Sequence, residues 1–176
     1  MYANARTPLE PFDSESGVEP LTWTSRIGFD RTLIERLVLS HDRLRACFAH
    51  CVGAAKRGER AEVLDAASTA ASELHALHRV EALRLYPIIA RQFVAEGGAP
   101  DDFTRRRLVL YSIGRRVLRI LESTLTTGFS GEHDAIELSA AASLFGTYVA
   151  EKQARFYPLY LRSANKEASG PIRAGA

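Results

Sequence analysis

Apolar side chains recur along this chain at the spacing of an α-helix. Over residues 29–56, 61–94, 102–126 and 134–162 they return every three or four positions. This spacing gathers them on one face of a helix, whereas a half-buried strand would alternate apolar and polar residues. No segment of the chain alternates in that way. The pattern predicts an all-α protein with four long helices.

The apolar stripes also indicate how these helices pack. Steps of three and four alternate along each stripe, as they do in the seam of a helical bundle. In the first segment the stripe comprises Ile34, Leu37, His41, Leu44, Phe48, Cys51 and Ala55. In the last segment it comprises Leu138, Ala141, Phe145, Tyr148, Lys152, Phe156 and Leu159. Four such helices with short connections favour an up-down-up-down four-helix bundle.

Short motifs predict where the helices begin and bend. Thr32-x-x-Glu35 and Asp134-x-x-Glu137 have the spacing of capping boxes, in which side chains satisfy the free N–H groups of a first turn. Pro87 lies late in the second helix. Because proline has no N–H, it should kink that helix or end its regular part.

One segment of the chain occurs twice in similar form. Residues 77–87 and 148–158 each form a helix-like run that ends in Tyr-Pro. Each copy closes one half of the folded region, so the chain is organised as two similar helical pairs. This organisation predicts a pseudo-twofold axis through the bundle.

The two ends of the chain lack helical periodicity. The N-terminal residues are rich in Pro, Ser, Glu and Thr, and we expect an extended arm anchored by Trp23. The glycines near the C-terminus favour a loose end. The predicted organisation is an arm at 1–28, a four-helix bundle at 29–163 and a flexible tail at 164–176.

Composition and charge exclude several classes of partner. The chain has 176 residues, enough to bury a core as one domain, and a formal net charge of +2, which gives no long-range attraction to nucleic acid or anionic lipid. It contains no apolar run of about 18 residues that would cross a membrane. The N-terminus lacks the apolar core of a secretory signal. We therefore expect a cytoplasmic protein without a membrane or nucleic-acid partner.

Polar residues interrupt the apolar stripes at one depth of the predicted bundle. His41, Glu81 and Lys152 lie on the stripes, with His78 and Tyr148 beside them. Burying such groups is costly unless they find partners. We therefore expect these five side chains to meet in the core.

With these polar positions, the layout resembles the bacterial hemerythrin-like family, also called HHE cation-binding domains, over about residues 29–162. The resemblance implies a bundle in which the first helix supplies an inward histidine. The second and fourth helices of that family each carry His-x-x-x-Glu ahead of a Tyr-Pro or Phe-Pro. Oxygen-carrying members hold a pair of irons with these imidazoles and carboxylates, which are residue types that suit iron and share one helix face at this spacing.

The ligand set that this resemblance implies is matched only in part. His41 corresponds to the ligand of the first helix. Glu81, six residues before Pro87, corresponds to the carboxylate of the second helix. The expected histidine of that helix falls on Leu77, with His78 next to it.

The fourth helix departs further from the family pattern. Its expected histidine falls on Tyr148 and its expected carboxylate on Lys152, with Glu151 next to it. An ammonium at this place would repel a metal cation and attract Glu81. We therefore expect a metal-free core cluster in which Glu81 and Lys152 form an ion pair, with Tyr148 and His41 hydrogen-bonding around it.

A metal site is the alternative to this cluster. Its ligands would be His41, His78, Glu81 and Glu151, holding mono- or dinuclear iron as the cofactor. A rotation of the last helix would be needed to turn Glu151 inward.

A basic face is expected on the third helix. It would meet an acidic partner or phosphate, or be solvated, and it comprises Arg105, Arg106, Arg107, Arg115, Arg116 and Arg119.

These features support two functions from different classes. The first is a non-catalytic regulatory or protein-interaction module that has largely lost its iron site and binds a protein partner through the third helix or the arm. The second is an iron protein that senses or binds dioxygen or nitric oxide through a reduced site. An enzyme is not expected, because the chain shows no nucleophile–base pair, Gly-rich phosphate loop or paired acids.

Overall fold

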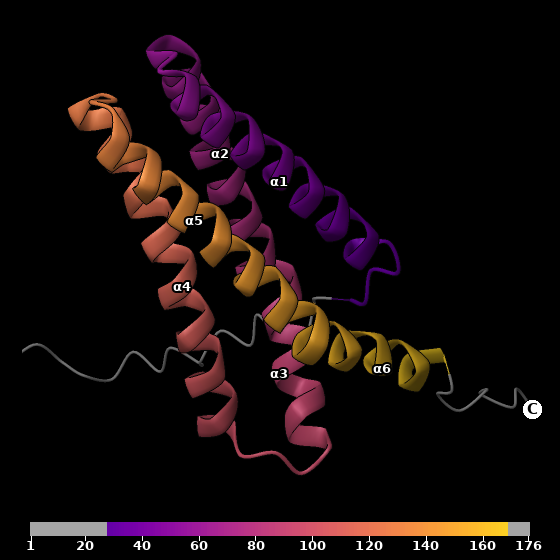
Figure 1. Cartoon of the computed structure of the whole chain (residues 1–176). Helices are drawn as coiled ribbons and strands as arrows, with labels where there is room; N and C mark the ends of the chain where they lie inside the picture. Colours follow the sequence, from indigo (N-terminus) through magenta and orange to yellow (C-terminus); the bar gives the residue numbers. More distant parts are fainter. Residues whose placement is uncertain (1–27, 169–176) are drawn as a thin grey trace, which may run out of the picture.

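A computed structural model of the chain describes residues 28–168, and every regular element in this range is helical. The all-α prediction is confirmed for these residues. Two of the four long helices drawn in Figure 1 contain a π-helical segment, which we call η. In chain order the elements are α1 (Leu33–Arg57), α2 (Arg60–Val80), η2 (Glu81–Leu85), α3 (Tyr86–Ala95), α4 (Pro100–Thr127), α5 (Glu132–Glu151), η3 (Lys152–Phe156) and α6 (Tyr157–Ala168).

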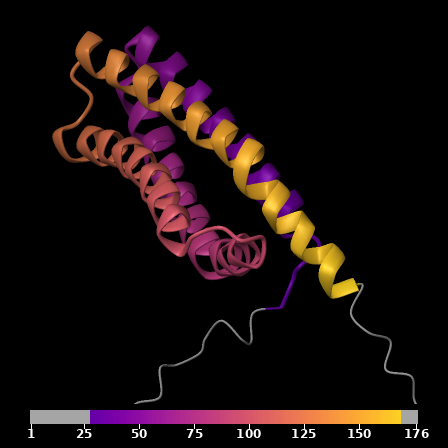
Figure 2. The same ribbon diagram turned by 90° about the horizontal axis from the view of Figure 1, so that it is seen from below.

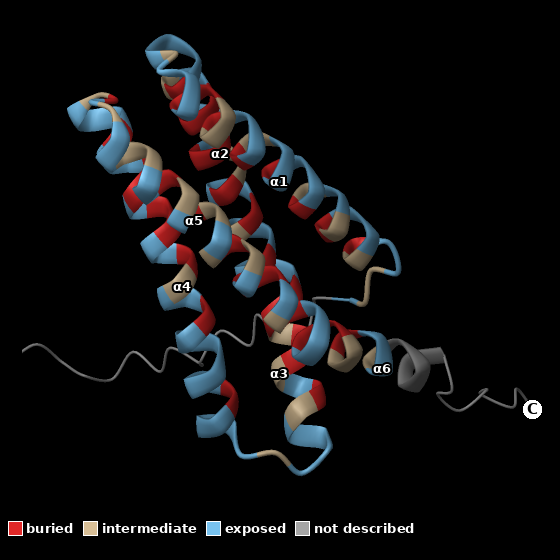
Figure 3. Ribbon diagram, viewed as in Figure 1, coloured by how far each residue is buried: buried red, intermediate tan, exposed pale blue. Residues whose placement is uncertain are grey.

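The helices pack as a bundle around one core. α1 lies against α2 and α5, α4 lies against the same two helices, and α3 packs on α6. Buried residues face inward on each helix and exposed residues face outward (Figure 3). The predicted stripe of the first helix is buried throughout, except that Leu33 rather than Ile34 fills its first position. None of the described helices is both long enough and apolar enough to cross a membrane.

The two copies of the sequence repeat adopt the same unusual backbone. η2 begins at Glu81 and η3 begins at Lys152, and each ends directly before a Tyr-Pro pair. A proline inside an α-helix would clash with the carbonyl four residues earlier, and the wider π turn removes that contact. The helix axis changes direction at both segments, from α5 to α6 in Figure 1 and from α2 to α3 in Figure 2. The kink predicted at Pro87 is therefore present, and a matching kink occurs at Pro158.

The π segment changes which residue of the last helix is buried. A π turn holds more residues than an α turn, so after Phe156 the inward-facing position shifts by one residue toward the C-terminus. Tyr160 is fully buried, whereas the predicted Leu159 is only partly buried. The Tyr160 hydroxyl donates a hydrogen bond of 3.0 Å to the Asp30 carbonyl and accepts one from the Asp30 N–H. The α6 segment thereby fixes the chain just before α1.

Several predicted helix boundaries are wrong. The first helix begins at Leu33 rather than near residue 29, and Thr32 makes no capping bond; its N–H and hydroxyl both donate to the Asp30 carboxylate. Asp134 lies inside α5 and accepts hydrogen bonds from Ser130.

The last helix continues to Ala168, beyond the end expected near residue 162. Most of the predicted arm, residues 1–27, lies outside the described residues, as do residues 169–176.

Candidate functional site

Glu81 and Lys152 form an ion pair in the centre of the bundle. Each residue opens a π segment, η2 or η3, at corresponding positions of the repeat. The Lys152 ammonium contacts Glu81 Oε1, and the two side chains are 0% and 1% exposed. Water is thus excluded from both charges, so each depends on the other for its stabilisation.

Aromatic side chains complete the surroundings of this pair. The Tyr148 hydroxyl donates a 2.6 Å hydrogen bond to Glu81 Oε2, the oxygen that does not face the ammonium. The Lys152 Nζ atom lies 3.5 Å from the centre of the Tyr148 ring and 5.9 Å from that of Tyr86. The negative faces of the two rings stabilise the ammonium where water would otherwise do so.

His41 joins the cluster from α1. Its Nε2 atom lies 3.8 Å from Glu81 Oε1, and the residue is fully buried. The Tyr157 ring stacks on the imidazole with 6.0 Å between ring centres and an interplanar angle of 7°. The Tyr157 hydroxyl lies 3.4 Å from both imidazole nitrogens. The helical periodicity did not predict this contact, although Tyr157 belongs to the Tyr-Pro repeat.

The electrostatics of the cluster keep the pair ionic near neutral pH. Burial raises the pKa of Glu81, but the adjacent Lys152 ammonium, the nearby His41 imidazole and the Tyr148 hydrogen bond outweigh it, so the net pKa lies below its usual value. Burial lowers the pKa of Lys152 to about 8, although the Glu81 carboxylate opposes the shift. Burial also raises the pKa of Tyr148, which keeps its hydroxyl proton available for Glu81. The structure thus brings together the four residues of the predicted core cluster.

His78 lies beside the cluster but does not join it. Its Nε2 atom is buried and has no hydrogen-bond partner, and its ring meets the Tyr148 ring edge-on at 5.7 Å. The space for the imidazole exists because α4 has a glycine there: a Cβ atom on Gly114 would lie 2.6 Å from Nε2. A cavity of about 120 Å³ adjoins the ring, lined by His78, Glu81, Ala82, Tyr86, Arg107, Tyr111 and Tyr148.

We expect the free energy of unfolding to fall between pH 6.5 and 5 because of His78. Burial lowers the pKa of His78 to about 4, although the Glu81 carboxylate opposes the shift. In this pH range the unfolded chain therefore binds a proton at His78 that the folded chain does not, which favours unfolding. His78→Gln should remove about 1 kcal/mol of this loss, a value reduced for the partial exposure of the ring.

Denaturant titrations at several pH values measure this effect. The control is His133→Gln, which removes an exposed imidazole at the start of α5. An equal pH dependence in the parent and in His78→Gln would contradict the assignment.

The four candidate metal ligands do not converge. The Glu151 carboxylate points away from the cluster and binds Arg155, with 2.9 Å between Oε2 and Nε. Among residues 28–168, no group of three or more His, Cys, Asp and Glu side chains is placed to hold a metal ion. The ammonium of Lys152 contacts the carboxylate that a cation would need. These donors therefore do not fit iron, and Glu151 is corrected from a candidate ligand to a surface ion pair.

Comparisons with family models, curated proteins and solved structures find no significant match for this chain. The resemblance to hemerythrin-like proteins therefore depends on the residues described above.

Proposed function

We propose that this chain is a cytoplasmic, non-catalytic regulatory module that binds a protein partner through the outer face of α4. In this proposal the scaffold is an up-down-up-down, hemerythrin-like bundle in which the Glu81–Lys152 ion pair takes the place of a metal centre. The fold holds the pair on two matching π segments, where the family pattern would place metal ligands.

The core cluster favours a structural role over a catalytic one. Lys152 is the strongest nucleophile candidate, but its side chain has no exposed surface and its charge is paired. Glu81 is equally enclosed, and both its oxygens have partners. A substrate would have to open the bundle to reach either group, so function is better assigned to the surface.

The outer face of α4 exposes large apolar side chains. Leu108, Val109 and Tyr111 are 54%, 56% and 55% exposed, although all three are large apolar residues. On a helix they are neighbours of the exposed arginines three to four positions away, which are Arg105, Arg106, Arg107 and Arg115. We call these seven residues the α4 face.

This composition indicates the chemistry of the partner. Protein interfaces are enriched in tyrosine and arginine, and apolar side chains gathered on a surface mark sites of association. Arginines around an apolar centre complement a segment that has acidic residues around apolar ones. The proposed partner is therefore a protein with an acidic, amphipathic segment.

We expect Leu108→Glu with Tyr111→Glu to abolish partner binding without unfolding the chain. Both side chains are exposed, so the substitutions should change stability by less than about 1 kcal/mol. Loss of two apolar anchors should weaken binding by about a hundredfold or more, at about 1.4 kcal/mol for each tenfold. Affinity capture with the parent as bait, followed by titration of the captured protein, measures this.

The matched control is Leu39→Glu on α1, where the leucine is 58% exposed. A partner that binds the parent and the α1 variant equally, but not the α4 variant, supports the proposal. A partner that binds all three, or nucleic acid in place of protein, contradicts it.

We expect protein purified from iron-replete cells to contain iron far below stoichiometry and to show no visible charge-transfer band. Tyr148→His with Lys152→Glu would rebuild His-x-x-x-Glu in the last helix and remove the repelling ammonium. This double variant should take up more iron than the parent, measured by elemental analysis. Stoichiometric iron in the parent would overturn the proposal in favour of the iron-sensing alternative.

A further inference from the structure

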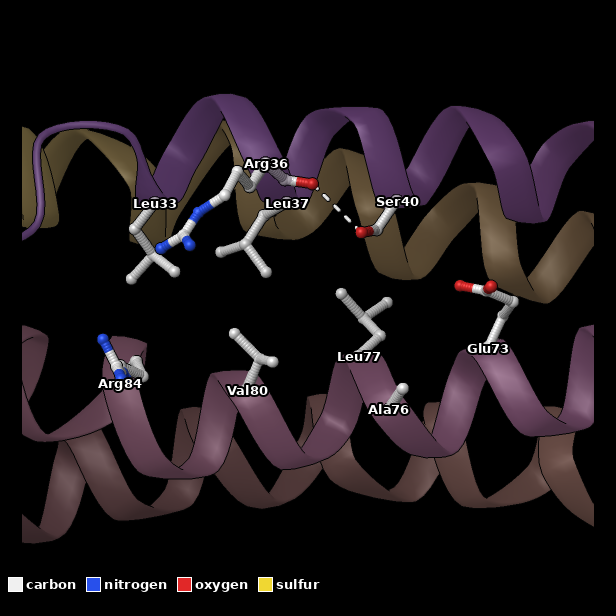
Figure 4. Close-up of a pocket in the computed structure, with 9 residues that line it drawn as sticks. All are labelled: Leu33, Arg36, Leu37, Ser40, Glu73, Ala76, Leu77, Val80 and Arg84. Atoms are coloured by element: carbon white, nitrogen blue, oxygen red, sulfur yellow. Dashed lines mark hydrogen bonds between the residues drawn. The ribbon is translucent and has the colours of Figure 1, made fainter.

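An open groove runs between α1 and α2 on the outside of the bundle. It has a volume of about 340 Å³ and is lined by Leu33, Arg36, Leu37, Ser40, Glu73, Ala76, Leu77, Val80 and Arg84. Figure 4 shows leucines of α1 facing Leu77 and Val80 across the groove, with Arg36 and Arg84 together at one end. The groove therefore joins an apolar floor to a cationic end.

We propose that part of the chain's own acidic N-terminal segment, residues 8–25, docks in this groove. The proposal does not depend on the function assigned to the α4 face.

The sequence of the segment complements the groove. Between Arg6 and Arg26 it contains no lysine or arginine, and its acids are Glu10, Asp13, Glu15 and Glu19. Its apolar residues, which suit the leucine floor, are Leu9, Phe12, Val18, Leu21 and Trp23. Three prolines, Pro8, Pro11 and Pro20, favour extended backbone, the form that fits a narrow groove between two helices.

The segment is also tethered at the correct end of the groove. The described chain begins at Gly28, five residues before Leu33, which lines the cationic end. Glu19 lies nine residues before Gly28. At about 3.3 Å per extended residue Glu19 can reach about 30 Å, while the stretch of α1 from Leu33 to Ser40 spans about 10 Å. Tethering makes docking intramolecular and raises the effective concentration of the segment.

The charges at the cationic end are unequally available to the segment. Arg36 already forms an ion pair with Asp30. Arg84 projects from η2 and is exposed, and Asp30 attracts it more weakly than it attracts Arg36. We therefore expect Arg84 to supply most of the attraction for the acids. Its charge is the one that a test should reverse.

The chain contains a single tryptophan, Trp23, which reports directly on the segment in the full-length protein. Docking against the leucine floor should shift its emission to shorter wavelength and protect it from acrylamide, a neutral quencher. Arg84→Glu should lower the ratio of docked to free segment by about tenfold. Neutralising the four acids together (E10Q, D13N, E15Q, E19Q) should have the same effect. Added NaCl should release Trp23 in the parent but change neither variant.

Controls separate this groove from other surfaces. Arg79→Glu changes an exposed arginine of α2 that does not line the groove and should leave Trp23 protected. Ala76→Glu fills the rim of the groove and should release Trp23. Circular dichroism confirms that each variant is folded.

Three results would overturn the proposal. The first is quenching of Trp23 in the parent equal to that of N-acetyl-tryptophanamide. The second is protection that survives both Arg84→Glu and Ala76→Glu but is lost on Arg116→Glu, which would place the segment on α4. The third is protection that increases with protein concentration, which would assign the contact to a second copy. The first and third results do not bear on partner binding by the α4 face, so the two proposals can fail separately.

Discussion

Replacing Lys152 by methionine is expected to lower the free energy of unfolding by about 3–5 kcal/mol. Methionine keeps much of the aliphatic stem but removes the ammonium, so the Glu81 carboxylate stays buried without its cation. The Tyr148 hydrogen bond alone cannot offset the desolvation of that charge. Urea titration at pH 7 measures the change, with a melting temperature lowered by about 10 °C.

The double variant Lys152→Met with Glu81→Leu distinguishes the net contribution of the ion pair to stability from the cost of leaving one charge buried alone. With both charges removed, most of the lost stability should return, because a buried ion pair often contributes no more than apolar residues of similar volume. The control is Lys56→Met, an exposed lysine in the last turn of α1, which should cost less than about 0.5 kcal/mol. Equal, small effects at Lys152 and Lys56 would contradict a structural role for the pair.

Gly114→Ala is expected to destabilise the protein by up to about 3 kcal/mol, although alanine normally favours a helix interior. The new Cβ atom would lie 2.6 Å from His78 Nε2 and 3.4 Å from the Tyr148 ring. The imidazole would have to move, and the Tyr148 ring beside it limits this movement. That ring is held in place by the hydrogen bond that its hydroxyl donates to Glu81. Thermal and urea unfolding measure the effect.

A second glycine provides a matched control. Gly146 lies inside α5, and a Cβ atom there would meet nothing within 4 Å. Gly146→Ala should therefore stabilise the protein by about 0.5–1 kcal/mol. His78→Ala should rescue Gly114→Ala, since it vacates the space that the methyl group needs. Failure of this rescue would show that the clash involves α4 itself and not His78.

Periodicity was sufficient to locate the core cluster. His41, Glu81 and Lys152 lie on the apolar stripes of three different helices at one depth of the bundle. The three side chains must therefore meet, because each helix has only one inward face. The expected ion pair and the Tyr148 hydrogen bond follow from the charges alone. Periodicity could not choose between Leu77 and His78, which are adjacent on the helix; the structure buries Leu77 and leaves His78 half-buried.

Contacts between helices that are distant in the chain could not be predicted from the sequence. Nothing in the pattern paired Tyr157 with His41, because the contact depends on the direction of α6 after η3. The role of Gly114 was equally hidden, since a glycine in a helical pattern does not reveal which side chain it accommodates. The same applies to Leu159 and Tyr160, whose burial is decided by the extra residue of the π turn.

The sequence by itself determined the helical class, the four long helices and the polar residues that had to meet, because these follow from local spacing and from the cost of burying charge. The tertiary structure decided the rest. It turned Glu151 outward to Arg155, set the π segments that aim Glu81 and Lys152 at one another, and opened the groove between α1 and α2. These features depend on the relative rotation and distance of helices far apart in the chain, and no periodicity within one helix encodes them.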